Sequence, residues 1–166
     1  KESRFDYLLI ESTGISEPIP VAQTFSFVNE EENIDLSRFS YIDTMVTVVD
    51  SFNFFKDFGS NQTLQESHLS TIENDKRSIV NLLVDQIEFA NIIILNKTDL
   101  VKNEVLVQLQ EIITKLNPGA KIIHAINGKI DINEIVNTQL FNYEAAEASA
   151  GWIQELEGNH TPETEE

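Results

Sequence analysis

The architecture of this chain is indicated most strongly by residues 91–99, which read Asn91-Ile92-Ile93-Ile94-Leu95-Asn96-Lys97-Thr98-Asp99. The first half is a continuous apolar run, without the alternation expected of a strand that has one face in water. Such a run is typical of a strand that is buried on both faces of a parallel sheet. Ligands of open α/β sheets bind outside the carboxyl ends of the strands, so residues 96–99 lie where a ligand site is expected.

The order of polar residues in this loop predicts that it recognises guanine. A carboxylate at Asp99 can accept hydrogen bonds from both N1 and N2 of guanine, which makes a charge-assisted bidentate contact. Adenine presents the opposite pattern on that edge, and the carboxylate left unpaired would reject it. The Lys97 stem can lie along the base plane, and the Asn96 amide can bond the ring and brace a neighbouring loop. The alternative interpretation is a polar turn after a strand, where Asn, Asp and Lys are common.

Similar apolar runs, separated by helical patterns, predict the rest of the sheet. The predicted strands cover residues 7–10, 45–49, 92–95 and 122–124. One helix is predicted from the apolar face within residues 79–87, and another from the face within residues 105–116. A third begins near Pro18 and Pro20, with Ser16 placed to cap it. The alternation of strands and helices predicts an α/β fold with a doubly wound, mostly parallel sheet.

The length of 166 residues fits one domain with a sizeable core. We expect residues 1–150 to form that domain. Residues 151–166 are interpreted as a tail or linker, because the apolar periodicity fades there. Residues 53–76 are mostly polar, and nothing is assigned to this region beyond a short helix around residues 52–57 and a surface loop.

The charge and composition exclude several classes of protein. A net charge of −17 argues against binding to nucleic acid and to anionic membrane surfaces, because both would repel the chain. No apolar run approaches the length of a membrane span, and the expected compartment is the cytosol. The absence of cysteine excludes a disulfide framework and a thiolate metal site within this chain. The acidic residues indicate a solvated surface, with binding of divalent cations as the alternative.

A second group of candidate residues follows the first predicted strand, in the sequence Glu11-Ser12-Thr13-Gly14. A carboxylate at a strand end, such as Glu11, suits Mg²⁺ held through a bound water. Gly14 lets the backbone N–H approach a terminal phosphate closely. A helix opens directly afterwards, so the γ-phosphate could order this loop and hydrolysis could release it. The alternative is a strand-to-helix turn with ordinary capping.

Other residues at strand ends carry weaker indications. Asp50 ends the second predicted strand and is interpreted as a cap for the following helix, although it also faces the expected cleft. Ala125 lies where a G domain makes a backbone contact to the base, an inference from position alone. The histidines are too scattered for a metal site, and we assign none of them as a ligand: His68, His124 and His160.

The chain resembles the CobW-type P-loop GTPases over residues 5–25, which include Ile10-Glu11-Ser12-Thr13-Gly14-Ile15-Ser16-Glu17-Pro18. The resemblance extends to residues 43–50, 83–90, 116–120, 151–156 and 160–166. In this family, whose members are metal chaperones, a Glu replaces the usual Asp of the magnesium motif. The resemblance implies that Glu11 and Gly14 serve Mg²⁺ and the γ-phosphate. It also implies that Asn96, Lys97 and Asp99 bind guanine.

Two other motifs of the family are missing from this sequence. It contains no phosphate loop of the form G-x-x-x-x-G-K-[ST] and no Cys-x-Cys-Cys motif for the transported metal. Both normally precede the segment that begins here, and a C-terminal domain normally follows, so the resemblance implies the middle portion of a larger protein. The phosphate-loop strand would lie beside the strand that ends in Glu11. We therefore expect this chain alone to bind nucleotide weakly or not at all, and to be inactive.

The function implied by the resemblance is that of a GTP-hydrolysing metallochaperone that delivers zinc or cobalt to a client protein. GTP or GDP and Mg²⁺ would be its cofactors, and hydrolysis would gate delivery of the metal. No residue is an evident base for activating water, and Thr13 and Glu17 are candidates for testing. Two alternatives stay open. One is a nickel-insertion GTPase of urease or hydrogenase maturation, and the other is a non-hydrolysing α/β interaction module.

Overall fold

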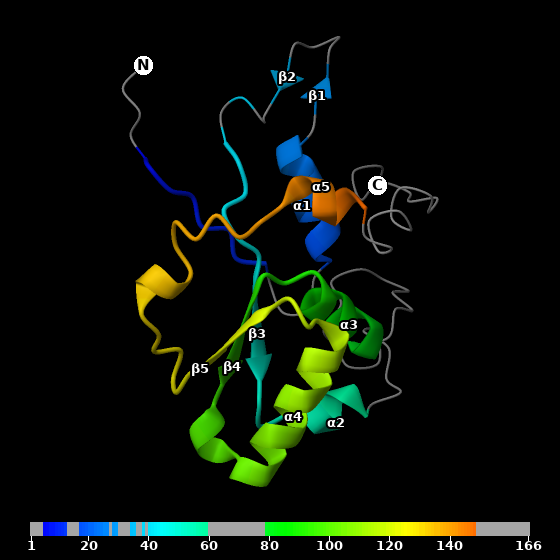
Figure 1. The fold of residues 1–166 in the computed structure, drawn as a ribbon, viewed down its shortest axis with the longest axis vertical. Helices are drawn as coiled ribbons and strands as arrows, with labels where there is room; N and C mark the ends of the chain where they lie inside the picture. Colours follow the sequence, from blue (N-terminus) through cyan, green and yellow to red (C-terminus); the bar gives the residue numbers. More distant parts are fainter. Residues whose placement is uncertain are drawn as a thin grey trace, which may run out of the picture.

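A parallel three-stranded sheet is the centre of the structure, a computed structural model that describes residues 5–12, 17–26, 28–29, 34–35, 38, 40–59 and 79–148 (Figure 1). Its strands lie in the order β3 (Val46–Asp50), β4 (Ile92–Asn96) and β5 (Lys121–His124). β3 pairs in parallel with β4, and β4 pairs in parallel with β5. Each strand begins and ends within one residue of its predicted range. The prediction of an α/β fold with a parallel sheet is therefore confirmed.

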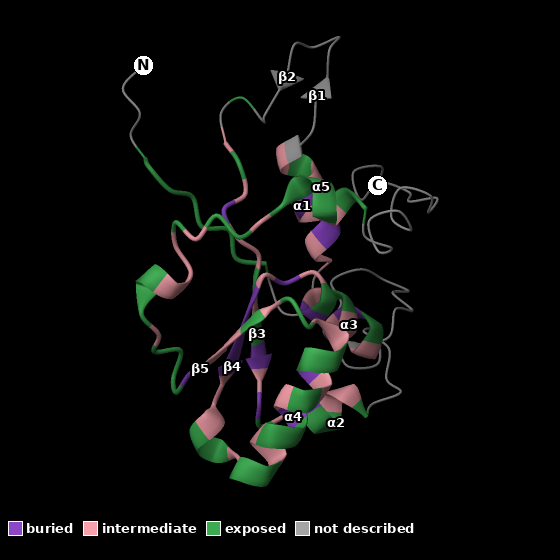
Figure 2. Cartoon of the chain, viewed as in Figure 1, coloured by how far each residue is buried: buried purple, intermediate pink, exposed green. Residues whose placement is uncertain are grey.

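β4 is the buried central strand, as its continuous apolar run predicts. Ile92, Ile93 and Leu95 are 0% exposed and Ile94 is 6% exposed. Ile93 and Leu95 belong to the core on the helical face of the sheet, whereas Ile92 and Ile94 belong to the core on the opposite face. Figure 2 shows the same contrast, with β4 buried and the helices exposing their outer faces. The absence of alternation in the sequence therefore reflects apolar neighbours on both sides of this strand.

One face of the sheet is covered by helices α2 (Phe54–Phe58), α3 (Ile79–Glu88) and α4 (Asn103–Leu116). These helices confirm the three that were predicted around residues 52–57, 79–87 and 105–116. Their buried side chains meet β3 and β4 in one cluster, which includes Phe54, Ile87, Leu109 and Ile113. Burying each such side chain contributes about 1.5–3 kcal/mol. None of the helices in the described ranges is long and apolar enough to cross a membrane.

Asn117 joins the ends of α3 and α4. Its Nδ2 donates to the carbonyl oxygens of Ile87 (2.8 Å), Glu88 (3.0 Å) and Ala90 (2.8 Å). Its Oδ1 accepts a hydrogen bond from the backbone N–H of Gly119 (3.1 Å). The turn that was predicted to stop α4 therefore also donates to carbonyl groups at the end of α3.

The opposite face of the sheet is covered at β4 but open at β3. Ile92 and Ile94 pack against the segment that follows β5, which includes the 3₁₀ helix η3 (Ile132–Glu134). Val46 and Val48 lie on this same face, because they pair in register with Ile92 and Ile94. They are nevertheless 37% and 62% exposed. The described part of the chain thus leaves an apolar strip of β3 without a cover.

A smaller unit lies above the sheet in the view of Figure 1, where α1 (Pro18–Ser26) packs against α5 (Tyr143–Glu147). The helix predicted near Pro18 and Pro20 is confirmed as α1. The sequence did not predict α5 or the short antiparallel pair of β1 (Val28–Asn29) and β2 (Ile34–Asp35). Three other predictions, the Ser16 cap, the loop beyond residue 59 and the tail over residues 151–166, fall outside the described residues.

Asp43, just before β3, connects segments that are far apart in the sequence. Asp43 is 8% exposed, and its carboxylate accepts hydrogen bonds from the Tyr7 hydroxyl (2.8 Å) and the N–H groups of Thr138 (3.1 Å) and Gln139 (2.7 Å). Burial acts to raise the pKa of Asp43, but these hydrogen bonds hold the pKa below its ordinary value. Burial of the phenol and its bond to Asp43 raise the pKa of Tyr7 to about 12. At neutral pH the charged Asp43 therefore anchors the N-terminal segment.

The first predicted strand, residues 7–10, is wrong, because this segment has no strand pairing. Leu8, Leu9 and Ile10 are 70%, 81% and 50% exposed, although they form an apolar run. A strand needs a neighbour for its backbone N–H and C=O groups. In the described ranges no strand lies beside residues 7–10. The apolar sequence therefore has the composition of a buried strand without the partner that would bury it.

Candidate functional site

The carboxyl ends of β3, β4 and β5 meet at the edge of the sheet where the sequence predicts a ligand site (Figure 1). Asp50 at the end of β3 is in register with Asn96 at the end of β4. The N–H of Ser51 donates to the carbonyl of Asn96 (3.1 Å), and the N–H of Ala125 donates to the carbonyl of Leu95 (2.8 Å). The loops that leave the three strands therefore start side by side.

The loop after β4 turns sharply at Lys97, which adopts the left-handed conformation with φ 60° and ψ 34°. This conformation is uncommon for a residue with a side chain, so neighbouring contacts must hold it. A short 3₁₀ helix, η2 (Thr98–Leu100), follows directly. Thr98 donates to the carbonyl oxygen of Ala125 from both its Oγ1 (3.1 Å) and its N–H (3.3 Å). The loop is therefore fastened to the segment that follows β5.

The second fastening comes from the turn after β5. Asn127 and Gly128 have φ 52° and 67°, and residues Ile126 and Lys129 pair across them. An Asn-Gly pair favours this type of turn because both central residues need a positive φ. The N–H of Gly128 donates to Oδ1 of Asn96 (2.9 Å), which is the bracing contact predicted for the Asn96 amide. The sequence does not single out Thr98 or Gly128 as the partners in these contacts, although the Asn-Gly pair is a signal for the turn.

Ala125 serves the loop through both of its backbone groups. Its carbonyl accepts from Thr98 and its N–H donates to Leu95 (2.8 Å). A backbone contact from Ala125 to the base stays a prediction, and it would require this N–H to be shared.

An ion pair joins the loop to β3. Nζ of Lys97 lies 2.6 Å from Oδ2 of Asp50, and the two side chains are 44% and 32% exposed. Asp50 also accepts from the N–H groups of Phe52 (3.0 Å) and Asn53 (3.2 Å) and from Nδ2 of Asn53 (2.9 Å). Burial acts to raise the pKa of Asp50, but Lys97 and these donors hold the pKa below its ordinary value. Asp50 is therefore charged and its acceptor sites are occupied.

The interpretation of Asp50 as a helix cap is accurate in part. Its carboxylate closes the turn that leads into α2, but the N-cap position of α2 belongs to Asn53, which makes no side-chain cap. The ion pair with Lys97 was not predicted. The available signal was that both residues follow neighbouring strands of a parallel sheet.

Asp99 has the opposite environment to Asp50. It is exposed, and its carboxylate makes no hydrogen bond or ion pair with the residues that the structure describes. Its neighbour Leu100 is 55% exposed. The loop thus presents an unpaired carboxylate close in sequence to a lysine whose ammonium group is already paired. This arrangement can accept two hydrogen bonds from a ligand edge.

The segment that carries the predicted magnesium residue, Glu11, does not lie beside this loop. Glu11 is exposed. Figure 1 shows its segment, residues 5–12 in dark blue, near the end of the sheet where the strands begin, away from the loop after β4. Gly14 and Thr13 fall outside the described residues, and Glu17 precedes α1. Residues 7–10, which precede Glu11, are not paired with the sheet, whereas a strand parallel to β3 would end at the carboxyl ends of the sheet.

Within the described ranges, no group of three or more His, Asp and Glu side chains could hold a metal ion. A magnesium ion in a nucleotide site needs only one or two carboxylates, because phosphate and water supply the other ligands. A single carboxylate such as Glu11 fits that requirement. His124 is exposed at the end of β5, and His68 and His160 fall outside the described residues.

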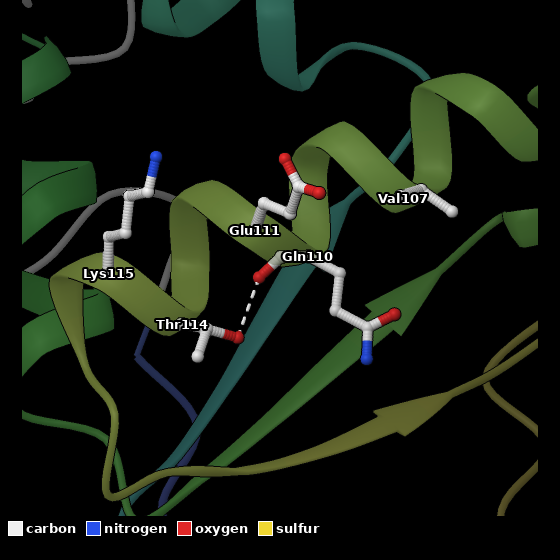
Figure 3. Close-up of a pocket in the computed structure, with 5 residues that line it drawn as sticks. All are labelled: Val107, Gln110, Glu111, Thr114 and Lys115. Carbon is white, nitrogen blue, oxygen red and sulfur yellow. Dashed lines mark hydrogen bonds between the residues drawn. The ribbon is translucent and has the colours of Figure 1, made fainter.

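A shallow hollow of about 420 Å³ lies on the outer side of α4 (Figure 3). Its lining residues come from this helix alone: Val107, Gln110, Glu111, Thr114 and Lys115. The Thr114 hydroxyl donates to the Gln110 carbonyl (2.8 Å). No residue from the strand ends takes part, so this hollow is separate from the candidate site.

Comparison with known proteins gives one family. The sequence model of the CobW/HypB/UreG nucleotide-binding domain matches residues 1–124. The "Zinc-regulated GTPase metalloprotein activator 1" of Dictyostelium discoideum is 43% identical over 164 residues, which are 99% of this chain and 34% of that protein. The protein of the same name from Schizosaccharomyces pombe is 34% identical over 145 residues, 87% of this chain and 30% of that protein.

A bacterial relative is more distant. The "Zinc chaperone CobW" of Pseudomonas aeruginosa is 27% identical over 135 residues, 76% of this chain and 33% of that protein. The comparison with solved structures gave no match. The chain spans about a third of the length of each of these relatives. Since the family model covers 124 of the 166 residues, this chain belongs to the CobW/HypB/UreG nucleotide-binding domain family.

Proposed function

We propose that this chain is the guanine-recognising part of a GTP-hydrolysing metallochaperone, with zinc as its cargo and cobalt as the second candidate. The observation that carries the proposal is the contrast between two aspartates at the strand ends. The Asp50 carboxylate pairs with Lys97 and accepts three hydrogen bonds from its own turn. Asp99 is exposed and has no partner in the described ranges. A free carboxylate in a braced loop is what recognition of the guanine N1–N2 edge requires.

In the proposed complex, the three loop residues have different roles. Asp99 accepts from N1 and N2 of the base, and the stem of Lys97 lies along the base plane. Asn96 uses Oδ1 to hold Gly128, so its NH₂ group is left to donate to the ring. Adenine is rejected because its corresponding edge would leave the Asp99 carboxylate unpaired.

The phosphate side of the proposed site needs Glu11 at the same edge as Asp99. We propose that the phosphate-loop strand of the whole protein lies along the free edge of β3 and pairs with residues 7–10. The free edge of β3 and the unpaired backbone of residues 7–10 support this arrangement, because such a strand would pair with both. Pairing would carry Glu11 to the carboxyl edge of the sheet.

Hydrolysis is proposed to rely on charge stabilisation rather than on a base in this chain. Mg²⁺, when bound, supplies neutralisation of the charge that develops on the phosphates. Glu11 would hold the ion through a water, and the backbone N–H of Gly14 would contact the γ-phosphate. Thr13 and Glu17 remain the candidates for positioning the attacking water.

The delivery of metal is proposed for the whole protein, since the relatives are about three times longer than this chain. Zinc is preferred because the relatives carry zinc in their names. A client protein would receive the metal, and we propose a cytoplasmic location. The net charge of −17 supports partners other than nucleic acid and anionic membranes. The nickel-insertion alternative would need a histidine-rich or cysteine-containing segment, and this sequence contains neither.

The proposal is tested by titrating fluorescent GDP, in the presence of Mg²⁺, into this chain and into its full-length gene product. We expect micromolar or tighter binding by the longer protein and weak or no binding by this chain, which lacks a phosphate-loop sequence. Asp99→Ala should abolish binding. Glu104→Ala, which removes another exposed carboxylate five residues away, is the matched control and should not change affinity.

Two outcomes would overturn this proposal. Binding that survives Asp99→Ala would show that the loop is a structural turn. Absence of binding by both proteins would favour the interaction module instead. The metal is tested separately by measuring GTP hydrolysis of the full-length protein with zinc, cobalt or nickel, and stimulation by nickel alone would favour the nickel-insertion alternative.

A further inference from the structure

We propose that Asp50 is a positioning residue for guanine recognition, which acts by holding the ammonium group of Lys97 so that the lysine stem lies ready beside the base. This inference rests on the proposed function, because it concerns the same nucleotide site. Asp50 lies outside the guanine loop itself, 47 residues before Lys97. The juxtaposition arises from the sheet, which puts Asp50 in register with Asn96.

The geometry of the pair supports a positioning role. The Lys97 Nζ to Asp50 Oδ2 distance of 2.6 Å is that of a charge-assisted hydrogen bond. The Lys97 ammonium group has no other hydrogen-bond or ion-pair partner within the described ranges. Its backbone is left-handed at φ 60°, so the direction in which the side chain leaves the loop differs from that of an ordinary turn residue. The ion pair therefore sets where the flexible lysine stem runs.

Asp50 is itself held rigidly before any ligand arrives. Oδ1 accepts from two backbone N–H groups, those of Phe52 and Asn53, and Oδ2 accepts from Nδ2 of Asn53. The backbone of the next residue, Ser51, is bonded to Asn96. A fixed anion is thus presented to a lysine that would otherwise sample many rotamers in water.

The expected consequence is a change in nucleotide affinity rather than in folding. A lysine that is already ordered loses less conformational freedom when the base packs against its stem. Without the Asp50 carboxylate, the Lys97 stem must become ordered as the base binds. We therefore expect GDP affinity to fall by about threefold to tenfold. A purely structural role for Asp50, closing the turn before α2, would instead lower the melting temperature and would not depend on Lys97.

A double-mutant cycle separates these roles. The variants are Asp50→Asn, Lys97→Met and the combination, made in the full-length gene product. The amide oxygen introduced by Asp50→Asn can still accept from the turn N–H groups, and the side chain introduced by Lys97→Met keeps most of the stem without the charge. The measurements are the dissociation constant of fluorescent GDP and the thermal midpoint.

We expect Asp50→Asn to weaken GDP binding in the wild-type background and to have no further effect in the Lys97→Met background. Glu134→Gln is the matched control, since it breaks the Lys121–Glu134 ion pair elsewhere on the sheet, and it should leave GDP affinity unchanged. Additive effects of the two substitutions, or an Asp50→Asn protein that binds GDP like the wild type, would overturn the inference. If Asp50→Asn does not fold, Asp50→Ser takes its place in the cycle and the same two outcomes decide.

Asp99→Ala distinguishes failure of this inference from failure of the proposed function. If Asp99→Ala abolishes GDP binding while the cycle is additive, only the role of Asp50 is wrong. If Asp99→Ala leaves GDP binding intact, the guanine site is wrong and the role of Asp50 falls with it.

Discussion

Gly128 donates its backbone N–H to the side-chain oxygen of Asn96 over 2.9 Å, between loops whose residues are 32 positions apart. This bond joins the loop after β4 to the turn after β5. The conformation of the loop after β4 is therefore imposed by the neighbouring strand as well as by its own sequence.

Replacing Asn96 by Ala should loosen the loop at this point. The loss of one partly exposed hydrogen bond should lower the free energy of unfolding by about 1 kcal/mol. GDP affinity of the full-length protein should fall more than this stability change suggests, because Asp99 and Lys97 lose their brace and the base loses the NH₂ donor of Asn96. Urea denaturation and a GDP titration measure the two effects. Asn133→Ala is the control, since that side chain bonds only within its own turn, and equal losses of GDP affinity in both variants would contradict the bracing role.

Asp43 should make stability depend on pH in the acid range. The pKa of Asp43 in the folded protein lies below its ordinary value of 3.8. A carboxyl group with a lowered folded-state pKa adds stability above its unfolded pKa and loses that stability as the pH falls through the folded value. The contribution should therefore be complete at neutral pH and should fade below about pH 4.

The variant Asp43→Asn tests this dependence. It should be less stable at pH 7 by about 1–3 kcal/mol, because the backbone donors of Thr138 and Gln139 lose a charged acceptor. Below pH 4 its unfolding free energy should fall less steeply than that of the wild type. Urea denaturation at a series of pH values gives both curves, and parallel curves would show that Asp43 does not titrate with folding.

The open face of β3 should tolerate a polar residue where the covered face of β4 does not. Val48 and Ile94 are neighbours in register, but Val48 is 62% exposed and Ile94 is 6% exposed. Val48→Thr in this chain should change the free energy of unfolding by less than about 0.5 kcal/mol and should reduce self-association. Ile94→Thr should cost about 2–4 kcal/mol, since it buries a hydroxyl and removes core volume. Urea denaturation and light scattering report these effects, and similar destabilisation by both changes would mean that Val48 is covered.

The sequence predicted correctly those elements that a local pattern of apolar residues specifies. The continuous apolar run predicts β4 directly, because this strand is buried on both faces. The amphipathic repeats predict α3 and α4, because each helix is buried along one stripe and its apolar residues recur with the helical period. The turn at Asn117 likewise ends α4 where expected.

The remainder depends on contacts that no local pattern contains. Residues 7–10 have the composition of a buried strand, but strand formation also needs a paired neighbour. The Asp50–Lys97 ion pair follows from the order of strands in the sheet, which the strand sequences alone do not specify. Likewise, only the folded structure shows that the Asp50 carboxylate is paired and the Asp99 carboxylate is not.

The recognition of guanine by Asp99 can be tested by exchanging the donors and acceptors of the base and the side chain together. Xanthine carries a carbonyl at C2 where guanine carries an amino group, so an Asn side chain at position 99 could donate to it. The full-length Asp99→Asn protein should lose GDP affinity by about two orders of magnitude. It should bind xanthosine diphosphate better than the wild type does. An Asp99→Asn protein that binds GDP as the wild type does, with no gain for xanthosine diphosphate, would show that this carboxylate does not bind the base.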